Sequence, residues 1–442
     1  MKKSRKMSAV TALGSLTAAV ALLAGAPDAG AQPASAGGGS FPGSFLVPGT
    51  NTSIKIGGFV KIVGIYDLDA RNGDTIAVDA IPVAGSAAHS LHGATRIHAR
   101  QSNLAADTRT PTAYGDLTTF ILFDFFGQNT SNAFNQSNTQ NARLVYAYGT
   151  LGPFLAGQWV SLFADTDAIP ESVDPTGFIG AMDGLDNRAP QFRYTFAAPG
   201  GFSAAVSIEQ PETDGFSNTP LPNANSFVAA GNAATATSNT FTESSLGGIN
   251  RYPDIIARGR LDQAWGHVAL SGMWRDEKIV APGLRFSKPS YAGQLSGHFN
   301  TFGKDSLKWT LAAGKAPGRY LTSLGRSSGA DGLQIASTAA GAASSAPNAY
   351  TANVGYTHWW TAALRSSIDA GYAKLQSSSS VITTAASRNG LDKRQYGGRA
   401  NVIWSPVPQV DLGVEYDYAR RTVQSGLSGN LHRVEVESVF KF

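Results

Sequence analysis

The sequence predicts an all-β protein, a sixteen-stranded antiparallel β-barrel that spans a membrane and carries long outer loops. Three observations lead to this prediction. Only 15% of the residues are charged, against the roughly 25% usual in soluble globular proteins, so much of the surface is expected to face lipid. After residue 31, no stretch approaches the ~18 consecutive apolar residues of a membrane-spanning helix. Segments of about ten residues instead alternate apolar and polar side chains, which is typical of a closed transmembrane barrel.

The first 31 residues predict a cleaved secretory signal peptide. Residues 2–6 are mostly basic, residues 10–24 carry no charge, and small residues at 29–31 offer a cleavage site before Gln32. A single anchoring helix is the alternative, but the apolar run is shorter than the ~20 residues needed to cross a bilayer. We therefore divide the chain into a signal peptide (1–31), a short N-terminal linker (32–52) and the barrel (53–442). This arrangement predicts a bacterial outer-membrane protein with both termini in the periplasm.

Charge and cysteine content exclude several classes of function. Removing residues 1–31 takes away Lys2, Lys3, Arg5, Lys6 and Asp28, so the formal net charge falls from +4 to +1. Binding of nucleic acid is not expected, because the exported chain has no global basic excess. The sequence contains no Cys, so disulfides, thiol nucleophiles and Cys-ligated zinc are ruled out.

The strands follow from the alternation of side chains. In the first segment, Ile56, Val60 and Ile62 share one face, while Lys55 and Lys61 lie on the other. The predicted strands cover residues 54–68, 92–106, 115–127, 141–150, 153–160, 190–197, 202–210, 253–264, 266–278, 289–301, 305–316, 350–361, 363–376, 393–405, 409–422 and 434–442.

The connections between these strands alternate between long and short. Long connections cover residues 70–91, 128–140, 161–189, 211–252, 279–288, 317–349 and 377–392, and tight links such as 198–201 and 302–304 lie between them. This is the pattern of an up-and-down barrel with short turns at one end. A secreted soluble β protein is the alternative, but it does not generally produce such strict alternation, and no fixed repeat period is present.

The last strand and the aromatic residues agree with the barrel. Phe440 and the terminal Phe442 share one face, which resembles the signal by which bacterial outer-membrane barrels are recognised for assembly. We assign ten aromatic residues to the lipid face and expect those near strand ends to form interfacial girdles, the alternative being that they fill an ordinary core. These are Tyr146, Tyr148, Phe192, Tyr194, Phe196, Trp274, Trp309, Trp404, Tyr416 and Tyr418.

The opposite face of the strands carries the candidate functional residues. A water-filled lumen with basic walls concentrates anions, and Arg binds carboxylates in bidentate fashion, so we expect small carboxylate solutes. The alternative is that these side chains pair with lumen acids as structure. The candidate residues that line the pore and attract substrate are Lys61, Arg96, His98, Arg100, Arg143, Arg193, Arg258, Arg260 and Arg399.

The chain resembles the DcaP-like outer-membrane porins. The motifs that match are SIKIGGFVK at 53–61, RTPT at 109–112 with YG at 114–115, FDFFG at 123–127, AYGTLG at 147–152 with LAGQ at 155–158, and PQFRY at 190–194. The resemblance implies a trimeric sixteen-stranded channel in outer-membrane lipid and lipopolysaccharide, with a basic constriction that admits dicarboxylates. Residues 32–52 lack the heptads of the coiled coil that some family members carry before the barrel.

In sixteen-stranded porins the third outer loop folds into the barrel, so we expect residues 161–189 to do the same. The acids of this candidate constriction loop would then face the basic wall. The alternative is that they lie on an outer loop in solvent or bind Ca²⁺, although no twelve-residue calcium-loop pattern is present. They are Asp165, Asp167, Glu171, Asp174, Asp183 and Asp186.

The sequence therefore predicts a passive, anion-preferring diffusion channel with no catalytic residue, no metal site and no cofactor. A G-x-S-x-G string at 325–329 lies in a Gly/Ser-rich loop without a strand-to-helix elbow, and the seven His show no close metal spacing. An outer-membrane hydrolase or adhesin mounted on a barrel is the alternative function. It predicts a plugged lumen or one dominant structured loop.

Overall fold

A computed structural model of the chain describes residues 38–69, 71–127, 141–174, 187–211, 215–217, 239–241, 251–281, 284–324, 332–338, 341–383 and 385–442. The predicted signal peptide and the first part of the linker lie outside the described residues. Among the described residues, no helix is long and apolar enough to cross a membrane.

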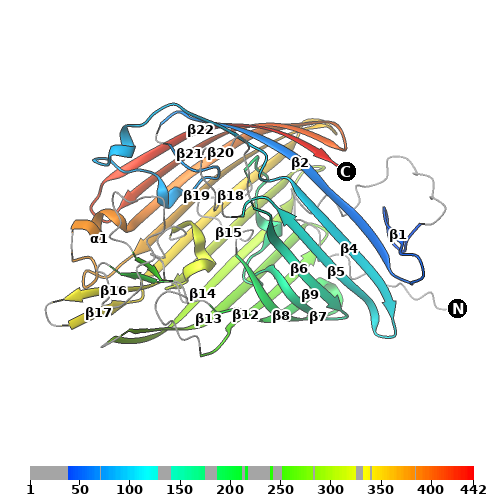
Figure 1. The fold of residues 1–442 in the computed structure, drawn as a ribbon, viewed down its shortest axis with the longest axis horizontal. Helices are drawn as coiled ribbons and strands as arrows, with labels where there is room; N and C mark the ends of the chain where they lie inside the picture. Colours follow the sequence, from blue (N-terminus) through cyan, green and yellow to red (C-terminus); the bar gives the residue numbers. More distant parts are fainter. Residues whose placement is uncertain are drawn as a thin grey trace.

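The structure is a closed antiparallel β-barrel of sixteen strands (Figure 1), which confirms the predicted fold class. The sixteen staves of the barrel are β2 (Ser53–Asp67), β3 (Ala94–His98) together with β4 (Asn103–Thr112), β5 (Gly115–Asp124), β6 (Arg143–Leu151), β7 (Phe154–Val160), β8 (Arg188–Ala197), β9 (Phe202–Glu209), β12 (Asp254–Gln263), β13 (Gly266–Ala281), β14 (Leu284–Asn300), β15 (Ser306–Lys315), β18 (Asn348–Trp359), β19 (Leu364–Gln376), β20 (Asp392–Val407), β21 (Val410–Val423) and β22 (Ser428–Lys441).

The first and last strands close the barrel. Strand β2 pairs with β22 from Phe59↔Lys441 to Asp67↔Arg433, so no sheet edge is left at the seam. Strands β3 and β4 both pair with β2 and together form one interrupted strand of the barrel. At the break, the Ser102 hydroxyl accepts from the Lys61 N–H (3.0 Å) and donates to the Lys61 carbonyl (3.2 Å), so a side chain replaces the missing ladder bonds.

The two ends of the barrel differ. Tight turns, such as η5 (Pro199–Gly201), and the C-terminal residues gather at one end, together with the short strand β1 (Phe45–Leu46) that pairs with the start of β2 (Figure 1). The other end carries the long connections. These contain η2 (Val78–Ala80), η3 (Ala87–Ser90), η6 (Gly318–Leu324), α1 (Ala385–Gly390) and a small sheet of β10 (Gly215–Ser217), β11 (Asn239–Phe241), β16 (Leu333–Thr338) and β17 (Gly341–Ser345).

Three predicted boundaries were wrong. The strand predicted at 92–106 is broken at residues 99–102 and continues to Thr112. The predicted long loop at 279–288 is mostly strand, because β13 runs to Ala281 and β14 starts at Leu284. The last strand begins at Ser428 rather than at 434. In the last case mostly polar residues, 428–433, continue the strand pairing, so composition did not mark the strand end.

The lipid side of the barrel is apolar and the interior is polar, as the alternation predicted. Ile56, Val60 and Leu104 are exposed on the outside, while Lys61 and Glu415 are buried inside. Among the assigned girdle residues, two were placed on the wrong side. Tyr146 pairs with Leu122 and Tyr148 with Phe120 on the inner face, because a β-bulge at Val145 reverses the alternation in β6.

Candidate functional site: the loop 3 channel wall

Residues 161–174, the described part of loop 3, lie inside the barrel and follow its inner wall. This segment leaves the end of β7 and contains η4 (Thr166–Ala168). It contacts β12, β14, β15 and β20, and at its end β2. Its first residues, Leu162 and Phe163, are fully buried and pack against Tyr320 and Leu321 of η6. The long loops therefore share an apolar core inside the barrel, on which loop 3 rests.

Side chains of the wall hold the backbone of loop 3. A backbone that leaves a sheet needs new partners for its carbonyl groups, because an unpaired buried carbonyl is costly. Polar donors on five strands supply them. The bonds are Gln294 to the carbonyl of Phe163 (3.1 Å), Arg258 to Ala164 (3.0 Å), Lys308 to Ile169 (3.0 Å), Asn401 to Glu171 (3.0 Å) and Lys61 to Val173 (2.7 Å).

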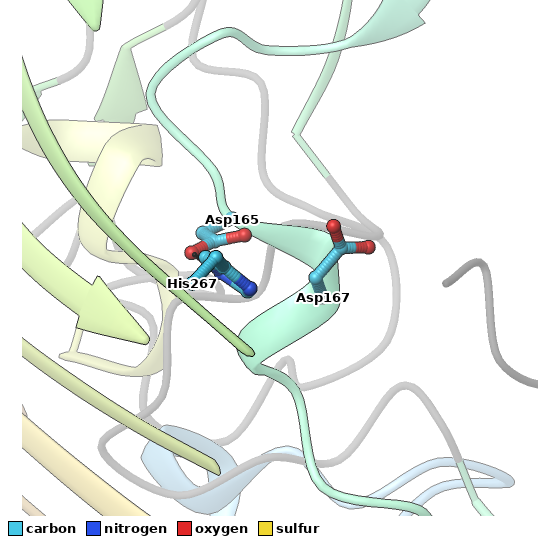
Figure 2. Close-up of side chains that lie close together, drawn as sticks. All are labelled: Asp165, Asp167 and His267. Carbon is cyan, nitrogen blue, oxygen red and sulfur yellow. Dashed lines mark hydrogen bonds and ion pairs between the residues drawn. The ribbon is translucent and has the colours of Figure 1, made fainter. Parts of the chain in front are cut away.

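A cluster of Asp165, Asp167 and His267 fixes the middle of loop 3 (Figure 2). The Nε2 atom of His267 lies 2.8 Å from an Asp165 carboxylate oxygen, and the Ser296 hydroxyl donates to the same oxygen at 2.6 Å. The Arg260 guanidinium lies 2.6 Å from Asp167 and 3.5 Å from Asp165. Loop 3 is thus tied here to three neighbouring strands.

Asp165 is buried, and burial alone would raise the pKa of its carboxyl. The hydrogen bond with His267 and the charges of Arg258 and Arg260 outweigh burial and hold this pKa well below its ordinary value of 3.8. The carboxylate is therefore ionised at any pH at which the channel is expected to work.

The far end of the described loop is capped by one buried carboxylate. Glu415 of β21 accepts from the Ser172 hydroxyl (2.8 Å) and from the backbone N–H of Val173 (3.1 Å) and Asp174 (3.4 Å). Arg399 of β20 donates to the Ser172 hydroxyl at 2.9 Å and pairs with Asp369 at 2.8 Å. Arg399 is therefore engaged in the wall and in loop 3.

Two inward glycines leave room for loop 3 to approach the wall. A Cβ at Gly355 of β18 would lie 2.5 Å from Cγ of Pro170, closer than real Cβ contacts. At Gly413 of β21 it would lie 3.0 Å from a Val173 methyl group and 2.8 Å from Glu437. These positions need glycine for space, not for an unusual backbone conformation.

Several candidate pore residues are paired with acids. Arg96 and Arg100 both contact Asp74, at 3.4 and 2.5 Å, and Arg96 also reaches Asp67 at 2.8 Å. His98, between them, is buried with its ring edge against Phe126. This group is therefore a compensated ion-pair network and not an open row of positive charge.

Other candidate residues also form ion pairs with side chains of opposite charge. Arg143 binds Asp124 in bidentate fashion, at 3.0 and 2.6 Å. Lys61 lies 2.8 Å from Glu437. Of the loop acids, Glu171 pairs with Arg365 at 2.7 Å. Asp183 and Asp186 lie outside the described residues.

Arg193 and Arg258 differ from the rest of the set. Each faces the interior, is half-buried, and lies on one side of β9, whose inward residues Ser203, Ala205 and Ser207 are small. Within the described chain, neither guanidinium has a carboxylate within ion-pair distance. Their hydrogen-bond partners are neutral oxygens: Gln191 and the Val160 carbonyl for Arg193, and the Ala164 carbonyl for Arg258. Asp165 is close enough to interact electrostatically with Arg258, and Glu209 with Arg193, but without a direct ion pair these two are the least compensated arginines of the candidate set.

The sequence patterns missed an aromatic group on the inner wall next to Arg193. The Trp159 ring lies 4.5 Å, centroid to centroid, from both Tyr146 and Tyr148, and Phe120 packs against all three. The available signal was the run Leu144-Val145-Tyr146, which breaks strict alternation and is compatible with a bulge.

Two groups of side chains have the composition of a cation site: Asp165, Asp167 and His267, and the buried acids Glu415, Asp417 and Glu435. In the first group, Arg260 already supplies positive charge to both carboxylates. Nothing in either group presents a nucleophile with an adjacent base. The arrangement favours passage and selection of solutes over a chemical reaction.

Comparison with known proteins agrees with this architecture. The family model of the porin subfamily matches residues 42–438. A search of the curated proteins found no match. Among solved structures, the outer membrane channel DcaP of Acinetobacter baumannii is similar with a TM-score of 0.71 at 19% identity, covering 90% of this chain and 99% of that chain.

Two further solved structures share the fold at lower similarity. The anion-selective porin from Comamonas acidovorans has a TM-score of 0.51 at 11% identity, covering 88% of this chain and 100% of that one. OmpT, an outer membrane protein of Vibrio cholerae, has a TM-score of 0.50 at 7% identity, covering 88% and 98%. At these identities the similarity establishes the fold alone.

Proposed function

Because the chain belongs to the porin subfamily, and is therefore an outer-membrane diffusion channel and not an enzyme, we propose that it passes small anionic solutes, dicarboxylates in particular. The observation that carries the proposal is the pair Arg193 and Arg258. Two guanidinium groups across one strand, each without a carboxylate partner in the described chain, offer bidentate donors for the two ends of a short dicarboxylate.

The charge balance of loop 3 supports the same proposal. Its acids would favour cations if they were free, but Asp165 and Asp167 contact Arg260, and Glu171 contacts Arg365. The negative charges of these three loop acids are thereby paired with basic side chains of the wall. One structural neighbour is described as anion-selective, which is consistent with the proposal and does not by itself establish it.

The proposal is tested by ion selectivity in a planar bilayer. Under a KCl gradient, we expect the reversal potential of the purified protein to shift toward the chloride potential, and added succinate to block the current. In the double variant Arg193→Ala/Arg258→Ala, we expect the anion preference to fall toward zero. Succinate block should weaken about tenfold or more, because a hydrogen bond to a charged group contributes about 1.5–3 kcal/mol.

Two matched variants serve as controls. Arg251→Ala removes an exposed guanidinium that stacks on Tyr252, outside the barrel strands, and should leave selectivity unchanged. Arg96→Ala/Arg100→Ala should have a smaller effect than the first double variant, because Asp74 already compensates both charges. A cation preference of the wild type, or an equal loss of cation and anion current in Arg193→Ala/Arg258→Ala, would contradict the proposal.

We also infer the topology and assembly of the mature protein. The end with tight turns, where the C-terminus and β1 lie, would face the periplasm, and the long loops would face outward toward lipopolysaccharide. Export would remove residues 1–31 and leave 32–52 as a linker. Three copies would assemble as a homotrimer. Mass spectrometry of the membrane-extracted protein should give an N-terminus at Gln32, and an uncleaved start would refute the signal peptide.

A further inference from the structure

Three buried carboxylates meet behind the end of loop 3. Glu415 and Asp417 lie on the inner face of β21, and Glu435 of β22 pairs directly with Glu415 across the two strands. One oxygen from each lies within 4.8 Å of the others. The three residues are 0%, 1% and 0% exposed. Three like charges at this spacing are strongly unfavourable unless something neutralises them.

The hydrogen bonds of this triad are incomplete. Glu415 is satisfied by loop 3 and by Asn401. In contrast, within the described part of the chain neither oxygen of Asp417 accepts a hydrogen bond, and one oxygen of Glu435 has no donor. A buried carboxylate without donors costs several kcal/mol, far more than one with them. The two side chains therefore point to a further positive partner.

The two neighbouring arginines are shared between the triad and other acids: Arg399 interacts electrostatically with Glu415 and Asp417, and Arg433 forms one ion pair with Glu435. Arg399 lies 2.8 Å from Asp369, and Arg433 lies 2.6 Å from Asp67, reaching only one oxygen of Glu435 at 3.1 Å. Asp174 of loop 3 is also close enough to interact electrostatically with both Asp417 and Glu435. The region behind loop 3 therefore carries an excess of negative charge, unlike the Asp165 cluster with its Arg260.

We propose that Glu415, Asp417 and Glu435 bind a divalent cation of the Ca²⁺ type, and that the ion fastens residues 172–174 of loop 3 to the barrel wall. All the available ligands are oxygens, which hard cations prefer, and no imidazole or thiol is present in the triad. The ion supplies the charge that Asp417 and Glu435 lack. Because Glu415 also holds the loop backbone, the ion stabilises the loop position indirectly.

Equilibrium dialysis with radioactive Ca²⁺ tests the proposal. The protein should be refolded from inclusion bodies in detergent, so that lipopolysaccharide phosphates contribute no binding. We expect a single saturable ion per chain, and an affinity at least tenfold lower in Asp417→Asn/Glu435→Gln. His267→Gln, which alters the other candidate cluster, should bind Ca²⁺ as the wild type does. Mg²⁺ should compete weakly, because it demands a smaller octahedral site.

Thermal unfolding of the wild type gives a second measurement that needs no variant. A ligand that binds only the folded barrel raises the unfolding temperature, so Ca²⁺ should raise it relative to EDTA. Absence of saturable binding up to about 10 mM, above the range of the weakest protein calcium sites, would overturn the proposal. So would equal binding by wild type and a folded Asp417→Asn/Glu435→Gln variant. Either result would mean that protons neutralise the triad.

Discussion

At the scale of single residues, the neighbours of an arginine decide its role. Arg193 and Arg258 donate to neutral oxygens and have no direct ion pair in the described chain, whereas Arg260 is shared among Asp165, Asp167 and Asp262. Sequence alternation places all three on the inner face but gives no information on which acids reach them. Asp262 lies two residues from Arg260 on β12, but Asp165 and Asp167 come from loop 3, whose path is not encoded in any strand pattern.

The Asp165 carboxyl gives a prediction for acid pH. Its pKa is lowered in the folded protein, so its contribution to stability is fully present above the ordinary pKa of 3.8 and is lost only as pH falls through the lower folded value. We therefore expect conductance and open-channel noise of the wild type to remain constant from neutral pH to about pH 4. Single-channel recording at stepped pH measures this.

The variant Asp165→Asn tests whether the bonds of Asp165 hold loop 3 against the barrel wall. It removes charge-assisted bonds with His267 and Arg260, each of which contributes about 1.5–3 kcal/mol. We expect the open-channel noise of Asp165→Asn to exceed that of the wild type at neutral pH, because loop 3 is held by fewer bonds. Asp262→Asn is the matched control, since Asp262 binds the same Arg260 but has no hydrogen bond or ion pair with residues 161–174, the described part of loop 3. This role of Asp165 would be contradicted if the open-channel noise of the wild type rose well above pH 4. It would also be contradicted if Asp165→Asn showed the same open-channel noise as the wild type.

At the scale of elements, regular alternation was predictable and its interruptions were not. The sixteen strands follow from the apolar and polar faces, because each side of a barrel strand meets a different solvent. The bulge at Val145 and the break at residues 99–102 depend on partners: the shift between Leu122 and Phe123 in the ladder, and the Ser102 hydroxyl that replaces ladder bonds. No single strand carries that information.

Docking of loop 3 on β18 can be tested by adding volume at Gly355. A Cβ there would lie 2.5 Å from the rigid Pro170 ring, so Gly355→Val should displace the loop and destabilise the barrel by about 1–3 kcal/mol. We expect a lower unfolding temperature and altered single-channel conductance. At Gly293, which faces outward on β14, a Cβ meets nothing nearer than 3.9 Å, and Gly293→Val should change neither property. Unchanged conductance in a folded Gly355→Val protein would argue against tight docking.

At the scale of the whole molecule, the barrel is reversed relative to a soluble domain. Apolar side chains such as Ile56 and Leu311 face outward, while buried charges such as Arg433 and Glu435 fill the inner wall. The composition predicted this reversal. A chain of this length with so few charged residues must cover much of its outer surface with apolar side chains. The anchoring of loop 3 was not predictable, since its donors come from strands that are far apart in the sequence and meet only after closure.

The proposed homotrimer gives the last prediction, because the outer face of a single barrel does not distinguish lipid from a partner subunit. Ile121 on β5 and Leu311 on β15 are 42% and 50% exposed in the single chain and lie on opposite sides of the ring of strands. We place the subunit contact over β2 to β7. Ile121→Arg would then put a charge between subunits, whereas Leu311→Arg would put it in lipid at a cost of up to about 2–4 kcal/mol. Crosslinking in detergent and in membranes should give trimers for the wild type and Leu311→Arg, but monomers for Ile121→Arg. Wild-type protein that crosslinks only as monomers would refute the trimer, and trimeric Ile121→Arg would move the contact to another face.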